Sequence, residues 1–127
     1  MKKIIFLLML GAIGFNMTAT AQKAINSIHF YNVKNADVEK IYISSIKEIN
    51  KIIAEIGFPK NYYSYHKLDA SDTTKTYRNC TIGHWTSEKD YKTIHDHPKF
   101  KAWGDKNKEN NGVYITGQLY RKFYDAD

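Results

Sequence analysis

The sequence is poor in the residues that cross-link or interrupt a small fold. It has one cysteine, Cys80, so no intramolecular disulfide can form, and we expect a buried, inert thiol. It also has only two prolines and two arginines. The formal net charge is +6, but the lysines are scattered among acidic residues and form no basic stripe. The sequence therefore predicts a protein that folds around a modest hydrophobic core without disulfide cross-links and has no nucleic-acid partner.

The single long apolar run lies at the N-terminus. Two lysines precede an apolar segment over residues 4–15, and Ala19-Thr20-Ala21 supplies the small-x-small pattern that a signal peptidase requires. The segment is too short to span a bilayer comfortably. We expect an exported protein, periplasmic or secreted, with no membrane attachment after cleavage. Its predicted parts are a signal peptide (1–21), a short tether (22–27) and a single domain (28–127).

Hydrophobic periodicity predicts four strands in the mature chain. Apolar and aromatic residues alternate with polar ones, and Gly117 is a candidate β-bulge in the last strand. The second and third strands are joined by a short polar segment, which favours an antiparallel hairpin. The predicted strands cover residues 28–33, 61–68, 76–85 and 113–124.

Apolar spacings of three and four residues predict two helical regions. The first begins at Asp37, the expected N-cap, and ends at Gly57. The second begins at Ser87, where Asp90 completes a pattern like a capping box. Its break at His97-Pro98 is followed by a short helix through Phe100 and Trp103, before the polar run over 104–112.

The order strand, helix, strand, strand, helix, strand predicts an α+β, ferredoxin-like βαββαβ fold. In this fold a four-stranded antiparallel sheet carries both helices on one face. The other face would expose a large apolar surface rich in tyrosine and isoleucine. We therefore expect a homodimer in which the uncovered faces of two sheets pack together.

The region over 81–106 resembles one branch of a known superfamily. A strand ends at Trp85, Ser87 caps a helix, Tyr91 follows, and HPKFKAW completes the broken helical region. This pattern is similar to the dimeric α/β-barrel superfamily, in particular its antibiotic-biosynthesis-monooxygenase-like and haem-degrading-monooxygenase-like branch. The resemblance implies a pocket between sheet and helices, which some members use for cofactor-free oxygenation or haem cleavage. The axial histidine position of the haem-degrading members falls at Gly104 and their tryptophan position at Ile94, so we expect no cofactor.

Three of the five histidines lie in HWTSEKDYKTIHDHPKF, residues 84–100. On a helix, zinc ligands usually stand at i and i+4, whereas His95 and His97 are two residues apart and point about 200° apart. His84 would have to converge on them from a separate strand, and no acidic fourth ligand has an obvious position. We therefore predict no metal site.

His84 and His95 are the candidate catalytic bases. By alternation His84 shares a strand face with Ile82 and Cys80, but the sequence does not say which face meets the helices. His29 and His66 also lie on strands, and they would form a polar cluster with His84 only if the unknown register brought all three to one face.

A polar and aromatic set is expected to line the pocket. The first expected role of the aromatic members is to pack the helices against the sheet. The asparagine matches a first-strand asparagine of the resembled family. The set is Asn32, Tyr63, Trp85, Tyr91, Phe100 and Trp103.

Two functions fit these residues. The first is an exported dimeric module that binds a small planar or apolar ligand in the pocket. The alternative is a cofactor-free monooxygenase or isomerase-like enzyme, with His84 or His95 as base and Asn32 or a tyrosine hydroxyl as orienting donor. A histidine facing an enclosed cavity within hydrogen-bond reach of such a donor would favour the enzyme.

Overall fold

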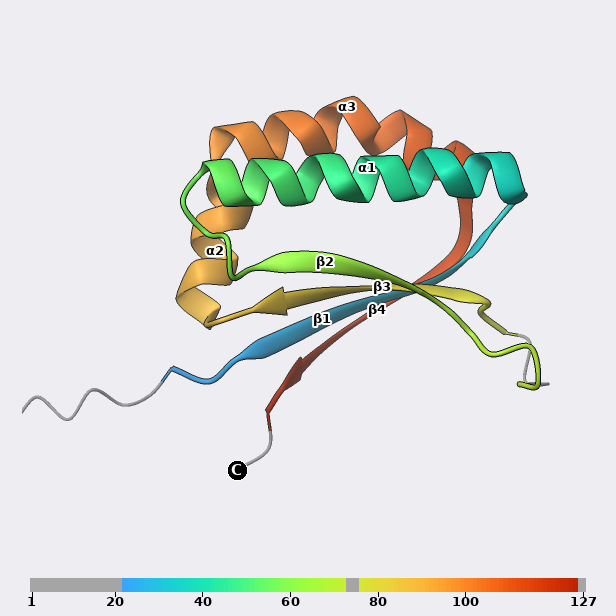
Figure 1. Ribbon diagram of the computed structural model, residues 1–127, viewed down its shortest axis with the longest axis horizontal. Coiled ribbons are helices and arrows are strands. Elements are labelled where there is room, and N and C mark those ends of the chain that lie inside the picture. The colour runs from blue at the N-terminus through green and yellow to red at the C-terminus, as the bar shows by residue number, and fades with distance from the viewer. Residues whose placement is uncertain (1–21, 73–75, 126–127) are drawn as a thin grey trace, which may run out of the picture.

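The computed structural model describes residues 22–72 and 76–125, without the side chains of residues 109–114. The predicted signal peptide lies outside the described residues. In chain order the elements are β1 (Ile25–Val33), α1 (Ala36–Glu55), β2 (Tyr62–Lys67), β3 (Asn79–Trp85), α2 (Glu88–Asp96), α3 (Pro98–Tyr114) and β4 (Ile115–Tyr124) (Figure 1). Within the described part of the chain, no helix is both long and apolar enough to cross a membrane.

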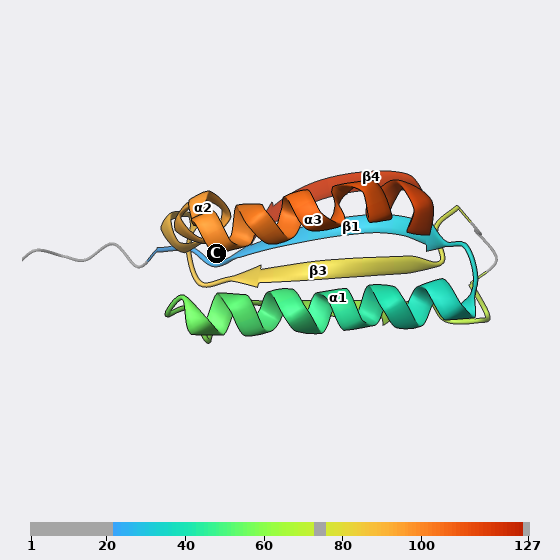
Figure 2. The same cartoon turned by 90° about the horizontal axis from the view of Figure 1, so that it is seen from above.

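The four strands form one antiparallel sheet in the order β2-β3-β1-β4. α1 and α3 lie side by side over one face, and α2 stands at the end of this layer (Figures 1 and 2). The ferredoxin-like fold predicted from the element order is therefore confirmed, as is the hairpin of β2 and β3. We call the covered side the helix face and the other side the open face.

The N-cap of α1 lies two residues earlier than predicted. The side chain of Asn35, and not that of Asp37, caps the helix by accepting from the backbone N–H groups of Asp37 at 3.1 Å and Val38 at 3.0 Å. Asn35 is extended, as an N-cap requires, and the helix therefore starts at Ala36. At the other end Gly57 takes a φ of 98°, which glycine adopts without strain, and ends the helix where predicted.

The second helical region confirms the predicted cap and break but is longer than expected. Ser87 accepts from the backbone N–H of Asp90 at 3.0 Å, and His97 before Pro98 is extended. α3 then continues through the polar run as far as Tyr114. The reason is polar packing against α1: Asn107 is buried, accepts from Ser45 Oγ at 3.3 Å and donates to the Trp103 carbonyl at 2.8 Å.

Two strand features complete the comparison with the sequence. β1 begins at Ile25, three residues before the predicted strand, and Ile25 and Ser27 are buried in the sheet although they were assigned to the tether. The β1–β4 register shifts between Phe30 and Asn32, leaving one extra residue on β4 beside Gly117, whose φ is 66°. The predicted bulge is thus confirmed.

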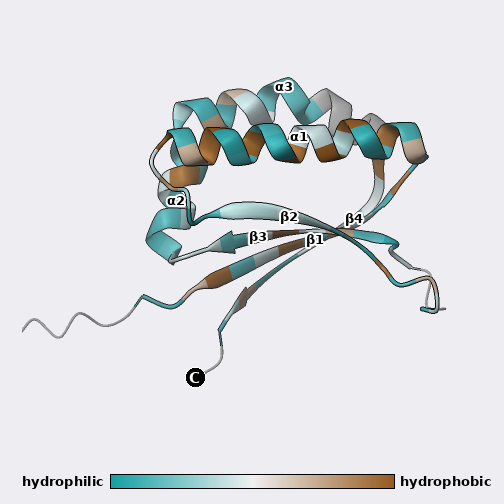
Figure 3. Ribbon diagram, viewed as in Figure 1, coloured by the Kyte–Doolittle hydropathy of each residue, from teal (hydrophilic) through white to brown (hydrophobic). Residues whose placement is uncertain are grey.

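The core lies between the helix layer and the helix face. Ile49 and Ile53 of α1 meet Ile25 of β1 and Trp85 of β3, and Ile94 of α2 closes the end. Figure 3 shows apolar residues on α1 and on the central strands, in the layers that face each other. Burial of these five side chains at no more than 2% exposure supplies the main hydrophobic stabilisation.

Candidate functional site

A cavity of about 130 Å³ lies between the helix face of the sheet and helices α1 and α3. Every strand contributes to its lining, and so do both long helices. Four lining residues are apolar or mainly apolar, and the others present an imidazole, an amide and hydroxyls. The lining consists of His29, Tyr42, Ile46, Ile49, Tyr63, Thr81, Trp103, Ile115 and Gln118.

The two periodicities of the sequence place these side chains. Tyr42, Ile46 and Ile49 lie at i, i+4 and i+7 of α1, so they share the helix face that looks onto the sheet. On the sheet, the register sets Tyr63 opposite Gly83 and His29 opposite Thr81, all on the helix face. An open space remains where the small Thr81 lies between larger neighbours.

Tyr63, which lines this cavity, forms a hydrogen-bonded pair with His95, which is not one of the lining residues. The Nδ1–H of His95 donates to the Tyr91 carbonyl at 2.7 Å, because a carbonyl can only accept. In the neutral ring Nε2 then carries a lone pair and accepts from the Tyr63 hydroxyl, at 3.3 Å. Burial lowers the pKa of His95, opposed by the Tyr91 hydrogen bond, and burial raises the pKa of Tyr63. Both groups are thus held neutral at pH 7.

His29 lines the cavity, although the sequence reasoning did not assign it to the pocket. Its Nδ1 accepts from the Gln118 side-chain amide at 2.8 Å, which fixes the tautomer with hydrogen on Nε2. Its ring packs on Tyr120 with 4.6 Å between centroids. Burial and the nearby His95 lower the pKa of His29. Alternation with the buried Ile25 and Ser27 was the signal in the sequence, but β1 was predicted to begin after both.

The predicted aromatic set is brought together around His95. The His95 ring lies 4.9 Å from Trp85, 4.0 Å from Tyr91 and 4.5 Å from Phe100, measured between centroids. Trp85 is a core residue, 2% exposed, and its indole N–H donates to Ser27 Oγ at 2.9 Å. Of this predicted set, Tyr63 and Trp103 line the cavity. Trp85, Tyr91 and Phe100 pack around His95 and do not line it.

The structure places two predicted site residues outside the cavity. Asn32 lies on the open-face side of β1, where it accepts from the Arg78 backbone N–H at 2.8 Å and donates to the Thr76 carbonyl at 3.0 Å. His84 also lies on the open face, because it alternates with the buried Gly83 and Trp85. Asn32 thus holds the chain that leads into β3, and neither residue reaches Tyr63 or His29.

His84 instead joins His66 around Ser64 on the open face. Ser64 Oγ lies 2.9 Å from Nε2 of His84 and 2.8 Å from Nε2 of His66. The proposed cluster of three histidines is therefore split, because His29 is on the helix face. Burial, and then His66, lowers the pKa of His84.

Among the described residues no group of three or more histidine, cysteine, aspartate or glutamate side chains is placed to hold a metal ion. His97 Nδ1 accepts from the backbone N–H of Lys99 at 3.2 Å, and Asp96 pairs with Lys101 at 3.1 Å. A haem does not fit either. Gly104, at the axial position of the resembled family, has no side chain to ligate iron, and a cavity of about 130 Å³ is far smaller than a porphyrin.

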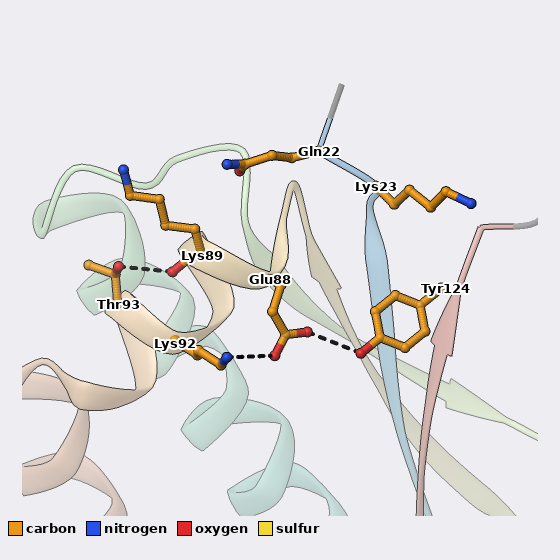
Figure 4. Close-up of a pocket in the computed structure, with 7 residues that line it drawn as sticks. All are labelled: Gln22, Lys23, Glu88, Lys89, Lys92, Thr93 and Tyr124. Carbon is orange, nitrogen blue, oxygen red and sulfur yellow. Dashed lines mark hydrogen bonds and ion pairs between the residues drawn. The ribbon is translucent and has the colours of Figure 1, made fainter. Parts of the chain in front are cut away.

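A wider hollow of about 620 Å³ lies where the chain enters β1, between α2 and the end of β4 (Figure 4). Its central acid, Glu88, accepts from the Tyr124 hydroxyl at 3.2 Å and pairs with Lys92 at 3.6 Å and Lys122 at 3.1 Å. The surrounding lysines belong to the surface.

Comparison with known proteins bears on the fold. No protein-family model matches the chain, and no curated protein matches it significantly. Solved structures do match across most of their length. A ferredoxin-like protein of the DABB family from Mesorhizobium loti has 14% identity and a TM-score of 0.62, covering 84% of this chain and all of that one.

Two enzymes are among the structural matches. The hydroxynitrile lyase of Passiflora edulis has 10% identity and a TM-score of 0.62, covering 83% of this chain and 95% of its own. SnoaB of Streptomyces nogalater, described as a cofactor-independent oxygenase, has 11% identity and a TM-score of 0.54, covering 82% and 94%. At these identities the matches establish the ferredoxin-like fold that the resemblance to the dimeric α/β-barrel superfamily implies.

Proposed function

We propose that this protein is an exported binding protein that holds one small planar ligand in the cavity between sheet and helices. The observation that carries the proposal is the cavity, which is mainly apolar but presents polar groups at fixed positions. Its volume of about 130 Å³ is close to that of an engineered cavity of about 150 Å³ that binds benzene. A ligand of single-ring size therefore suits it.

A cavity-filling variant tests this proposal. Ile46 is 7% exposed and lines the cavity, so Ile46→Phe would occupy part of the space. Ile41→Phe, on the same helix but 49% exposed, is the matched control. Mass spectrometry of small molecules that co-purify from the native host should find one compound with the wild type and Ile41→Phe, and none with folded Ile46→Phe. The same compound on all three proteins would contradict the assignment.

The proposal includes export and a homodimer. Export rests on the N-terminal sequence, and an intact mass for the exported protein that begins at Gln22 would support it. The dimer rests on the open face, where Ile28, Phe30 and Leu119 form a half-buried apolar surface that none of the described helices covers. Two of the similar structures are described as dimeric ferredoxin-like proteins, one from Thermobifida fusca and one from Bacteroides fragilis.

A second function, proton-transfer catalysis, is favoured by the Tyr63–His95 pair. A ligand that presents an acidic C–H to Tyr63 could pass its proton to the tyrosine oxygen while the hydroxyl proton moves to His95 Nε2. The Tyr91 carbonyl would stabilise the imidazolium that forms. Such a step is the first one that cofactor-free oxygenation or isomerisation requires.

Hydrogen–deuterium exchange at the α-carbons of cyclohexanone, followed by NMR in D₂O, measures this step without a known substrate. The wild type should accelerate the exchange. Tyr63→Phe and His95→Gln should each reduce the accelerated exchange rate about a hundredfold. His84→Gln, on the open face, should leave it unchanged. Equal exchange with all four proteins would leave binding alone as the function.

A further inference from the structure

A serine hydroxyl on the open face stands between two imidazole rings. Ser64 Oγ lies 2.8 Å from Nε2 of His66 and 2.9 Å from Nε2 of His84. A hydroxyl has one proton, so it can donate to one of these nitrogens and accepts from the other. Both contacts are hydrogen bonds when the two imidazoles are neutral and hold opposite tautomers, one with hydrogen on Nε2 and one without.

Protonation of the accepting ring breaks this arrangement. An imidazolium has hydrogen on both nitrogens, so both rings would then donate toward Ser64 Oγ and the hydroxyl proton would have to turn away. The Ile82 carbonyl can accept it only across 3.4 Å, which is a long hydrogen bond. A charge on one ring also disfavours a charge on the other: burial, and then His66, lowers the pKa of His84. The cluster therefore favours two neutral rings.

No carboxylate lies beside this cluster in the described sheet. The four strands that the structure describes contain no aspartate or glutamate. In the neighbouring strands, Tyr62 and Asn26 are paired with His84, and Cys80 is paired with His66. The Tyr62 ring packs on His84 with 4.7 Å between centroids, and burial raises the pKa of the Cys80 thiol. A positive charge on either histidine would therefore meet no opposite charge from the sheet.

The charged groups around the cluster do not change this. Arg121 of β4 shares the open face by alternation. The loop between β2 and β3 adds Arg78, which donates to the backbone carbonyls of Asp69 at 3.3 Å and Asp72 at 3.1 Å. The Asp69 carboxylate accepts from Ser71 of the same loop. The described strands thus add only positive charge to the open face.

From this geometry we infer that the open face pairs with a second copy of this chain only while His66 and His84 are neutral, so that acid separates the dimer into folded protomers. The inference rests on the homodimer of the proposed function and names the residues that control it. A second copy presents the same face and so brings no carboxylate from its strands. It also removes water from the cluster, and a cation buried without an opposite charge is strongly unfavourable.

The dimer dissociation constant as a function of pH tests the inference. Sedimentation equilibrium of the protein at pH 8, 7, 6 and 5 measures the constant, and circular dichroism at each pH reports whether the protomer stays folded. The constant should rise about a hundredfold from pH 7 to pH 5, because one histidine of each protomer takes up a proton as the dimer separates. An equal constant at both pH values, or dissociation only together with unfolding, would overturn the inference.

Substitution shows whether these two histidines are the groups that titrate. The double variant with His66→Gln and His84→Gln keeps the cluster neutral, so its constant should change less than about threefold over the same range. His84→Arg adds a permanent charge and should weaken the dimer about tenfold already at pH 8. The control His97→Gln, at the break between α2 and α3, should behave as the wild type. Wild-type pH dependence in the double variant would overturn the inference. A monomer at every pH would remove the homodimer itself, and with it this control of pairing.

Discussion

The two faces of one sheet differ because the described helices cover only one of them. On the helix face Ile25 is fully buried and Trp85 is 2% exposed, and the Trp85 indole N–H and the Tyr63 hydroxyl each have a specific partner. On the open face Phe123 is 48% exposed and Tyr62 is 45% exposed, although they come from strands of the same sheet. Alternation thus divides the residues into two sets, and the helices decide which set becomes core and cavity.

The largest effect that this comparison predicts is at Gly83, on the helix face. A Cβ at this position would lie 2.5 Å from Trp85 Cζ2 and 2.6 Å from Ser27 Oγ. Gly83→Ala should therefore displace the indole and break its bond to Ser27, which lowers the free energy of unfolding by about 3 kcal/mol. Urea unfolding measures the change.

Gly104→Ala is the matched control for Gly83→Ala. A Cβ at Gly104 of α3 meets nothing within 4 Å, and alanine favours the helix by about 1 kcal/mol. The two substitutions should therefore change stability in opposite directions. A similar small effect from both would mean that Trp85 does not need the space above Gly83.

The sequence predicts those features of the fold that depend on local interactions. The Ser87 cap, the Pro98 break and the Gly117 bulge are local, and the sequence predicted each of them. The long α3 was missed because contacts with α1, such as Asn107 with Ser45, hold its polar residues.

The candidate site divides in the same way. Tyr63 and His95 were both among the predicted residues, but their pairing depends on how α2 docks on β2. His29 was missed and Asn32 was misplaced because the assignment of strand faces depends on the register and on which face the helices cover. One residue along β1 decides between the two faces, and only the tertiary structure settles that.

The open face supplies the prediction of intermediate size. If a second copy covers it, Phe123→Lys should place a charge in the interface and raise the dimer dissociation constant about tenfold, which is about 1.4 kcal/mol. Ile41→Lys, an exposed apolar residue on α1, should leave the constant unchanged. Light scattering across a dilution series measures both. A monomeric mass for the wild type at micromolar concentration would show that the open face has no such cover.

The smallest predicted effect is in the pH dependence of stability, and it links the two faces. The pKa values of His95 on the helix face and His84 on the open face are lowered from the ordinary 6.5, in both cases mainly by burial. As the pH falls below about 6.5, these two histidines therefore bind protons in the unfolded chain but remain mostly unprotonated in the folded chain. The free energy of unfolding should be level above this pH and decrease below it.

Substitution separates the contributions of the two histidines. His95→Gln should flatten the decrease more than His84→Gln when the protein is dilute, because His84 is then partly open to solvent. At concentrations where the open faces pair, His84 becomes covered and its contribution should grow, whereas that of His95 should stay the same. Urea unfolding between pH 5 and pH 8 at two protein concentrations would show this. A contribution of His84 that does not depend on concentration would place the dimer contact away from the Ser64, His66 and His84 cluster.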